Sequence, residues 1–189
     1  MRFGGMAMNK DSINAEMRLN KAEYDPQKFL IVADSFFYAA EICSNSYKPG
    51  EEIFPKVQIA IFTNRAFACE IYIKAVLYYC GISIPKKDSN GNYFDGHNLT
   101  LLFSLLSDEI KEAVYSYYRN LSKSGFYDKI LLIANAFEEM RYAYEYRSLK
   151  TEIVFLESFT KYLKETAHNI IGTNQQTIPS SPVPADQNP

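Results

Sequence analysis

The amino-acid sequence predicts an all-α fold, an antiparallel bundle of roughly four to five helices, and three observations lead to this prediction. Residues 56–80 carry apolar side chains on two opposite helical faces. Apolar residues recur at helical spacing in several other long segments, and no segment shows the strict apolar–polar alternation of a strand. At 189 residues and 47% hydrophobic content, the chain is long enough for one domain with its own core and short for two. We therefore expect a single helical domain.

The segment from Lys56 to Cys80 is the predicted central helix. On a helical projection, one face carries Val57, Ala60, Ile61, Ala68, Ile71 and Ala75, and the opposite face carries Phe62, Ala66, Ile73, Leu77 and Cys80. A surface helix has one apolar stripe, so a helix with nearly two belongs at the centre of a bundle. The narrow polar seam that remains holds Lys56, Thr63, Glu70 and Lys74.

The other helices are predicted from capping residues and apolar spacing. Asp25 is a preferred N-cap residue, and Pro26 suits the first helical position, where its missing N–H is not needed. Gly81 lies just beyond the central helix, where glycine is favoured, and Gly172 is expected to end the last helix. Ser107 is the expected N-cap of a helix after the middle of the chain. The predicted helices cover residues 26–46, 56–80, 99–106, 107–121, 126–146 and 151–171.

The chain is predicted to divide into an arm, a domain and a tail. Residues 1–24 are polar with thin apolar content, so we expect a loosely ordered arm. Residues 25–172 form the single helical-bundle domain, in which 85–96 is the longest irregular stretch, of a length typical of functional or mobile loops. Residues 173–189 are rich in proline and have almost nothing to bury, which predicts a disordered tail.

Charge, cysteine spacing and hydropathy exclude several classes of protein. With 20 basic against 22 acidic residues, no net field draws the chain to nucleic acid or to anionic lipid. Cys43, Cys69 and Cys80 form no CxxC pair, so we expect no disulfide framework and no metal site, and we expect the two in the central helix to be buried thiols. No apolar segment fits a signal peptide or a membrane span, which favours a cytoplasmic protein.

Arg141 is the most informative polar residue, because it projects from the apolar face of the predicted helix 126–146. A buried arginine without a partner would be strongly destabilising, so we expect a carboxylate nearby, either Glu145 one turn later or Glu70 on the central seam. One interpretation is a structural ion pair that holds two helices in register. The alternative is a pocket for a phosphate or ribose group, lined by Arg141 with Lys74 and His97.

His97 directly precedes a predicted helix and follows the long loop. At such a position a histidine is either a capping or packing residue or an acid–base group, and acid–base work would require Glu70 or Glu145 within hydrogen-bond reach. We expect no special role for His168, on a polar stretch of the last helix. The sequence has no nucleophile elbow, phosphate-binding glycine loop, HExxH motif or paired acidic metal motif, so we expect no metal and no cofactor.

Three segments of the chain, ACEIYIKAVLYYCG, GHNLTLLFSLL and FEEMRYAYEY, carry a family resemblance. Together they resemble members of the HEPN superfamily of small prokaryotic helical domains, in which an E-x-x-x-K segment of a central helix is followed by an H-[DN]-L helix start and an R-Y-x-Y-E segment. The resemblance implies an antiparallel helical bundle, frequently a homodimer, found in toxin–antitoxin and phage-defence systems or beside nucleotidyltransferase partners. The positions that match its polar pattern are Glu70, Lys74, His97, Arg141, Tyr144 and Glu145.

The chain departs from this family at the motif that the resemblance associates with activity. Active members carry R-x(4–6)-H, a metal-independent ribonuclease site across the dimer, whereas no arginine here is followed by a histidine at that spacing, and Arg141 begins RYAYEY. Our first hypothesis is therefore a non-catalytic or weakly active HEPN-like module that dimerises and binds a nucleotide, RNA or a protein partner in a prokaryotic defence or toxin–antitoxin setting. The second is a metal-independent ribonuclease that uses His97 with Arg141 and a carboxylate. The third is a purely structural interaction protein.

Overall fold

A computed structural model describes residues 25–46, 54–87, 90–141 and 152–172. Within these ranges the regular elements are helices, apart from one isolated antiparallel bridge between Lys87 and Tyr93. The helices are α2 (Pro26–Asn45), α3 (Phe54–Tyr79), α4 (Leu99–Ser104), α5 (Asp108–Tyr115), α6 (Lys123–Leu132), α7 (Ala136–Arg141) and α8 (Ile153–Gly172). The predicted all-α class is confirmed for this part of the chain.

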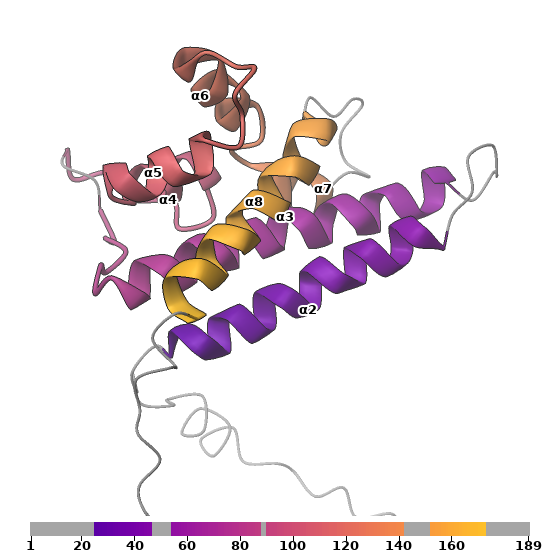
Figure 1. The fold of residues 1–189 in the computed structure, drawn as a ribbon, viewed down its shortest axis with the longest axis horizontal. Coiled ribbons are helices and arrows are strands. Elements are labelled where there is room, and N and C mark those ends of the chain that lie inside the picture. The colour runs from indigo at the N-terminus through magenta and orange to yellow at the C-terminus, as the bar shows by residue number, and fades with distance from the viewer. Residues whose placement is uncertain (1–24, 47–53, 88–89, 142–151, 173–189) are drawn as a thin grey trace, which may run out of the picture.

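The helix α3 lies at the centre, as predicted. It runs antiparallel to α2, α8 crosses the pair, and α4 and α7 also pack against α3 (Figure 1). Side chains around most of its circumference are buried, among them Ile61, Phe62, Ala66, Cys69, Tyr72, Ile73, Val76 and Leu77. The placement of Cys80 is a correction, because Cys80 follows the last helical residue and is exposed, whereas Cys69 is buried as expected.

The predicted N-cap of α2 and the predicted glycine at the C-terminal end of α3 are both present. The Asp25 side chain accepts a hydrogen bond from the Gln27 N–H at 3.0 Å, with Pro26 as the first helical residue. After α3, Gly81 adopts φ +70°, a conformation that a side chain would disfavour. The Ile82 N–H then reaches back to the Leu77 carbonyl at 2.8 Å, which closes the helix end.

The predicted single helix over 126–146 is wrong, because the structure divides the segment into α6 and α7. At the break, the freed Ala134 carbonyl accepts the Leu99 N–H at 2.8 Å, and the Asn135 side chain accepts the Asn98 side-chain N–H at 2.8 Å. The interruption therefore leaves the Ala134 carbonyl, which an unbroken helix would have paired internally, available to the start of α4. Of the four longest predicted helices, 26–46, 56–80, 126–146 and 151–171, the described residues contain three as single helices, α2, α3 and α8.

Several predictions concern segments outside the described residues. They are the arm 1–24, the tail 173–189 and the continuation of the 126–146 helix beyond Arg141. Among the described helices, none combines the length and apolar character that a membrane crossing requires. The predicted helix 107–121 is shorter than expected and ends at Tyr115.

Candidate functional site

Three of the predicted site residues, Glu70, Lys74 and His97, meet around one carboxylate, and we call them the Glu70 cluster. Glu70 lies in the middle of α3 with a side chain only 2% exposed, so its charge requires partners. Lys74, one turn later, places Nζ 2.6 Å from Oε1 of Glu70. His97 places Nδ1 3.1 Å from Oε1 and 3.2 Å from Oε2. These hydrogen bonds thus join the loop that carries His97 to the central helix α3.

Hydrogen bonds and ring stacking fix the position of the loop that carries His97. The His97 N–H donates to Oδ1 of Asp95 at 2.9 Å, and Asn98 caps α4 by accepting the Leu101 N–H at 3.0 Å. The imidazole stacks on the Phe137 ring with centroids 6.4 Å apart, and Phe137 stacks on Phe67 at 4.7 Å. The histidine therefore has a defined orientation, although its side chain remains 61% exposed.

The orientation of His97 decides which ring nitrogen is available for chemistry. A carboxylate only accepts hydrogen bonds, so the contact with Glu70 assigns the Nδ1 position as the donor. In the neutral ring, Nε2 then carries the lone pair and can accept a proton or a hydrogen bond from a ligand. The Glu70 cluster thus presents a positioned base or acceptor at the protein surface.

A cavity of about 420 Å³ opens beside the Glu70 cluster, within the size range of small-molecule sites. It is lined by Lys28, Phe29, Val32, Phe67, Glu70, Ile71, Lys74 and His97. Most of this wall is apolar, and the charged groups comprise two lysines against one glutamate, a net charge of +1 with the imidazole neutral. The cavity is therefore an apolar space with a weakly cationic, hydrogen-bonding edge.

A second, smaller cavity of about 290 Å³ adjoins the first at His97. Its lining residues are Tyr93, Asp95, His97, Phe137 and Glu138. This second space is acidic where the first is cationic, so a ligand with a negative group would be held in the larger cavity and repelled from the smaller one. His97 lies between them.

The structure does not place the remaining predicted site residues, which are Arg141, Tyr144 and Glu145. Arg141 is the last residue of α7, and its side chain, together with Tyr144 and Glu145, lies outside what the structure describes. Their contribution to the site stays a prediction. The partners of Glu70 in the described part of the chain are Lys74 and His97, which satisfy the carboxylate without Arg141.

A second group of polar residues, the Asp34 cluster, was not predicted and consists of Asp34, Tyr72, Lys164 and His168. The Asp34 carboxylate accepts hydrogen bonds from Tyr72 Oη at 2.6 Å, Lys164 Nζ at 2.5 Å and His168 Nε2 at 3.0 Å. Burial alone would raise the pKa of Asp34, but the hydrogen bonds from Lys164, Tyr72 and His168 outweigh it and lower the pKa. His168, for which we expected no special role, thus helps to join α8 to α2.

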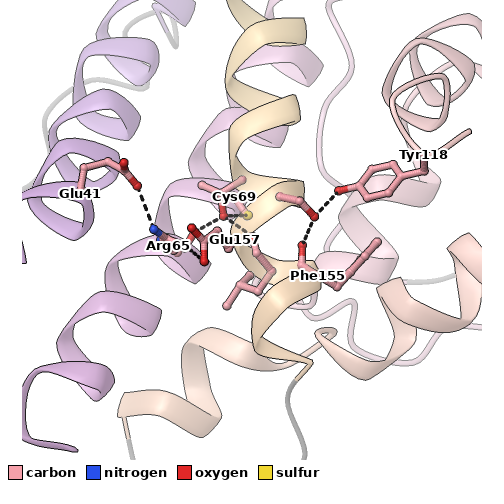
Figure 2. Close-up of polar contacts among 9 residues, drawn as sticks. Glu41, Arg65, Cys69, Tyr118, Phe155 and Glu157 are labelled. Carbon is pink, nitrogen blue, oxygen red and sulfur yellow. Dashed lines mark hydrogen bonds and ion pairs between the residues drawn. The ribbon is translucent and has the colours of Figure 1, made fainter. Parts of the chain in front are cut away.

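Arg65 was also missed, and its buried guanidinium pairs with partly exposed carboxylates of two other helices. Figure 2 shows Arg65 of α3 between Glu41 of α2 and Glu157 of α8, each 2.8 Å from a terminal guanidinium nitrogen. Arg65 lies on the same helical face as the buried Cys69 and Tyr72. The reasoning applied to Arg141, an arginine on an apolar face, would therefore have identified it.

Cys69 packs beside this ion pair, and its chemistry is that of a core residue. Its sulfur lies 3.1 Å from the hydroxyl of Thr160 on α8. Burial raises the pKa of the Cys69 thiol to about 12, so the reactive thiolate is not formed near neutral pH. Neither Cys69 nor Arg65 is a candidate for catalysis.

No group of three or more His, Cys, Asp or Glu side chains is arranged to hold a metal ion in the part of the chain that the structure describes. Comparisons with protein-family models, with curated proteins and with solved structures find no match to this chain.

Proposed function

We propose that this chain is a HEPN-like helical module, an antiparallel bundle that binds a nucleotide, free or within RNA, in the cavity beside the Glu70 cluster. One observation carries the proposal. A buried carboxylate, Glu70, holds Lys74 and His97 at the polar edge of an otherwise apolar cavity of about 420 Å³. Convergent polar groups at the edge of an apolar space are the usual arrangement of a small-molecule site.

The parts of a nucleotide match the groups of this cavity, which are apolar walls, a hydrogen-bond acceptor and two lysines. A nucleobase has flat apolar faces, which suit the walls formed by Phe29, Phe67 and Ile71. Its polar edge requires donors and acceptors, and His97 offers an acceptor there. The phosphate requires cations, which Lys28 and Lys74 supply with the net charge of +1.

The HEPN-like part of the proposal draws support from the meeting of two motif segments. The E-x-x-x-K segment contributes Glu70 and Lys74, the H-N-L segment contributes His97, and the Glu70 carboxylate contacts both of the other side chains. The proposal includes the setting that the resemblance implies, a prokaryotic defence or toxin–antitoxin system, with a homodimer and a nucleotidyltransferase-type protein as expected partners.

Binding of a short fluorescein-labelled single-stranded RNA, with mononucleotides as competitors, tests the proposal at low salt, where electrostatic attraction is strongest. We expect fluorescence anisotropy to rise with protein, and Lys74→Ala to weaken binding at least about tenfold, a loss of about 1.4 kcal/mol. The matched control is Lys86→Ala, which removes an exposed lysine that lines neither cavity. An absence of binding at low salt, or equal losses in the two variants, would contradict the proposal.

A second candidate function, metal-independent cleavage of RNA, is favoured by the orientation of His97. With Nδ1 held by Glu70, Nε2 is free to take the proton of a ribose 2′-hydroxyl, and the 2′-oxygen would attack the adjacent phosphorus. The products would be a 2′,3′-cyclic phosphate and a free 5′-hydroxyl. As the bond between phosphorus and the 5′-oxygen breaks, that oxygen would take back the proton held on Nε2 of His97. In this mechanism Arg141 offsets the charge on the phosphate, and the carboxylate is Glu70, which holds Nδ1 of His97.

Cleavage of labelled RNA in the presence of EDTA separates the two candidate functions. Loss of cleavage in His97→Ala and Arg141→Ala with unchanged melting temperatures would support the ribonuclease. A fall in melting temperature for Arg141→Ala alone would support a structural ion pair instead. If RNA binds and is not cleaved, the result would support the binding module.

A further inference from the structure

The smaller cavity of about 290 Å³ borders the proposed nucleotide site at His97, which lines both spaces. Two aromatic side chains, Tyr93 and Phe137, and two carboxylates, Asp95 and Glu138, complete its lining. Among these described residues there is no lysine or arginine, so two carboxylates and no cation give a net charge of −2 with the imidazole neutral. The smaller cavity therefore combines aromatic surface with hydrogen-bond acceptors.

The loop side of the smaller cavity is held by backbone contacts. An antiparallel bridge pairs Tyr93 with Lys87, and the Phe94 N–H donates to the Lys86 carbonyl at 3.1 Å. Tyr93 and Asp95 both line the cavity, whereas Phe94, between them, is buried, which is the alternation expected of extended backbone. Tyr93 is 80% exposed, so its ring is accessible to a ligand in the cavity.

Aromatic surface continues from one cavity to the other. Phe67 lines the larger cavity and Phe137 the smaller one, and their rings stack with centroids 4.7 Å apart and planes 21° apart. The imidazole of His97, which lines both cavities, stacks on Phe137 in turn at 6.4 Å. Because the bases of single-stranded RNA bind by stacking on such rings, the two adjoining cavities suit two neighbouring bases of one strand.

The charges of the two cavities direct the parts of such a dinucleotide. The phosphate that joins two nucleosides is anionic, and Lys28 and Lys74 favour it on the side of the larger cavity. Asp95 and Glu138 repel the phosphate from the smaller cavity, so the neutral base is the part that enters there. The volume of about 290 Å³ lies at the lower end of small-molecule sites, which suits a single base.

The hydrogen-bonding groups of the smaller cavity select among the four bases. A carboxylate only accepts hydrogen bonds, so the edge of the base that faces it must donate. Guanine presents two adjacent donors, N1–H and N2–H, which match the two oxygens of one carboxylate as a bidentate pair. Adenine and cytosine place one amino group beside an acceptor nitrogen, and uracil places N3–H between two carbonyl oxygens. Each of these three bases would therefore set an acceptor against the carboxylate.

We propose that the smaller cavity is a second base site, which holds a guanine next to the nucleotide in the larger cavity. This inference rests on the proposed function, because the larger cavity must hold the neighbouring nucleotide. Of the two carboxylates, Glu138 pairs with the guanine edge, since Oδ1 of Asp95 already accepts the His97 N–H at 2.9 Å and holds the loop. Glu138 is exposed and directly follows Phe137 in α7, so one helix supplies both the stacking ring and the acceptor.

Isothermal titration calorimetry with dinucleoside monophosphates tests the second base site. The compounds ApA, ApC, ApG and ApU form one series, and CpA, GpA and UpA cover the opposite strand polarity. We expect the guanine compound of one series to bind at least about tenfold tighter than the other members, as a bidentate contact to a base predicts. Guanosine 5′-monophosphate should show no comparable preference over adenosine 5′-monophosphate, because its own phosphate keeps a mononucleotide in the larger cavity.

Two variants separate the guanine contact from the stacking contact. Glu138→Gln keeps the size of the side chain but sets an amide donor against a guanine donor, so the guanine preference should fall to within about twofold. Tyr93→Ala should weaken every dinucleotide at least about fivefold and leave the preference intact. The matched control is Glu109→Gln, at an exposed glutamate of α5 that lines neither cavity, which should bind as the native chain does.

Several results would overturn the second base site. They are equal affinities for the four bases, a guanine preference already present between the mononucleotides, and a preference that survives Glu138→Gln. Competition with the guanine compound by agmatine, which carries a guanidinium group but no base, would assign the cavity to organic cations instead. Binding of adenosine 5′-monophosphate without any guanine preference would contradict only this inference, whereas an absence of binding by all of these nucleotides would contradict the proposed function as well.

Discussion

Two clusters in this protein combine a carboxylate, a lysine and a histidine, and they lie in different surroundings. In the Asp34 cluster, the donors to one carboxylate come from α3 and α8 while the acceptor belongs to α2, so the hydrogen bonds join three helices. In the Glu70 cluster, the glutamate and lysine share one helix, and only His97 comes from elsewhere. The Asp34 cluster therefore holds the fold together, and the Glu70 cluster mainly positions His97.

The two clusters also differ in whether open space adjoins them. Lys164 of the Asp34 cluster lies over the rings of Phe37 and Tyr38, at 4.9 and 4.5 Å from their centroids, so its outer side is covered. The Glu70 cluster lines a cavity and leaves the His97 ring exposed on one side. The same three residue types thus join helices in one cluster and border an open cavity in the other, according to which elements supply them.

Removal of the Asp34 carboxylate should have the largest effect on stability. We expect Asp34→Ala to lower the free energy of unfolding by about 3 kcal/mol at neutral pH, because it leaves the buried Tyr72 hydroxyl without an acceptor and the Lys164 ammonium without a counter-ion. Chemical denaturation measures this change. The control Asp128→Ala, at an exposed position of α6, should stay within about 0.5 kcal/mol of the native chain. Equal effects of the two substitutions would show that the cluster does not hold the helices.

The contribution of Asp34 should also depend on pH in a defined direction. Its pKa is lower in the folded chain than its ordinary value of 3.8, so the ionised form is favoured by folding. The stabilisation is then fully present above pH 3.8 and is lost as the pH falls below that value toward the folded pKa. We expect the difference in stability between the native chain and Asp34→Asn to shrink in acid. A difference that grows there would contradict the assigned hydrogen bonds.

Substitution of the histidine in the Asp34 cluster should have a moderate effect on stability and none on ligand binding. We expect His168→Ala to lower the free energy of unfolding by about 1 kcal/mol, because one of three hydrogen bonds to Asp34 is lost. Nucleotide affinity should stay within about twofold of the native value, since the residue lines neither cavity. A loss of nucleotide affinity in His168→Ala without loss of stability would indicate that the Asp34 cluster binds the nucleotide.

The smallest effect on stability is expected for the histidine of the Glu70 cluster. His97→Ala should change the free energy of unfolding by less than about 0.5 kcal/mol, because the ring is exposed and Glu70 keeps its contact with Lys74. Nucleotide affinity should fall about tenfold, because the edge of the cavity loses its acceptor. Destabilisation without loss of affinity would reverse the roles that we assign to the two clusters.

The features that could be predicted from sequence are those determined by local spacing. The apolar periodicity of α3 identified the central helix, and the four-residue spacing of Glu70 and Lys74 placed both on one side of it. His97 was identified by its position between a long loop and a helix start. Each of these inferences requires only a few neighbouring residues and the geometry of a helix.

The features that could not be predicted depend on contacts between distant segments. The break between α6 and α7 has no glycine or proline to mark it, and its hydrogen bonds are made with the start of α4. Asp34 and His168 are separated by 134 positions, and each alone resembles an ordinary surface residue. Their roles appear only when α2 and α8 pack side by side on α3.

The central claim, that the Glu70 cluster binds a nucleotide while the Asp34 cluster is structural, is tested most directly by proton NMR of the histidine rings. The chain has only 2 histidines, His97 and His168, one in each cluster, so single substitutions assign both ring signals. On titration with adenosine 5′-monophosphate, we predict a saturable shift of the His97 signal and an unchanged His168 signal. A shift confined to His168, or no shift of either signal at saturating nucleotide, would contradict the claim.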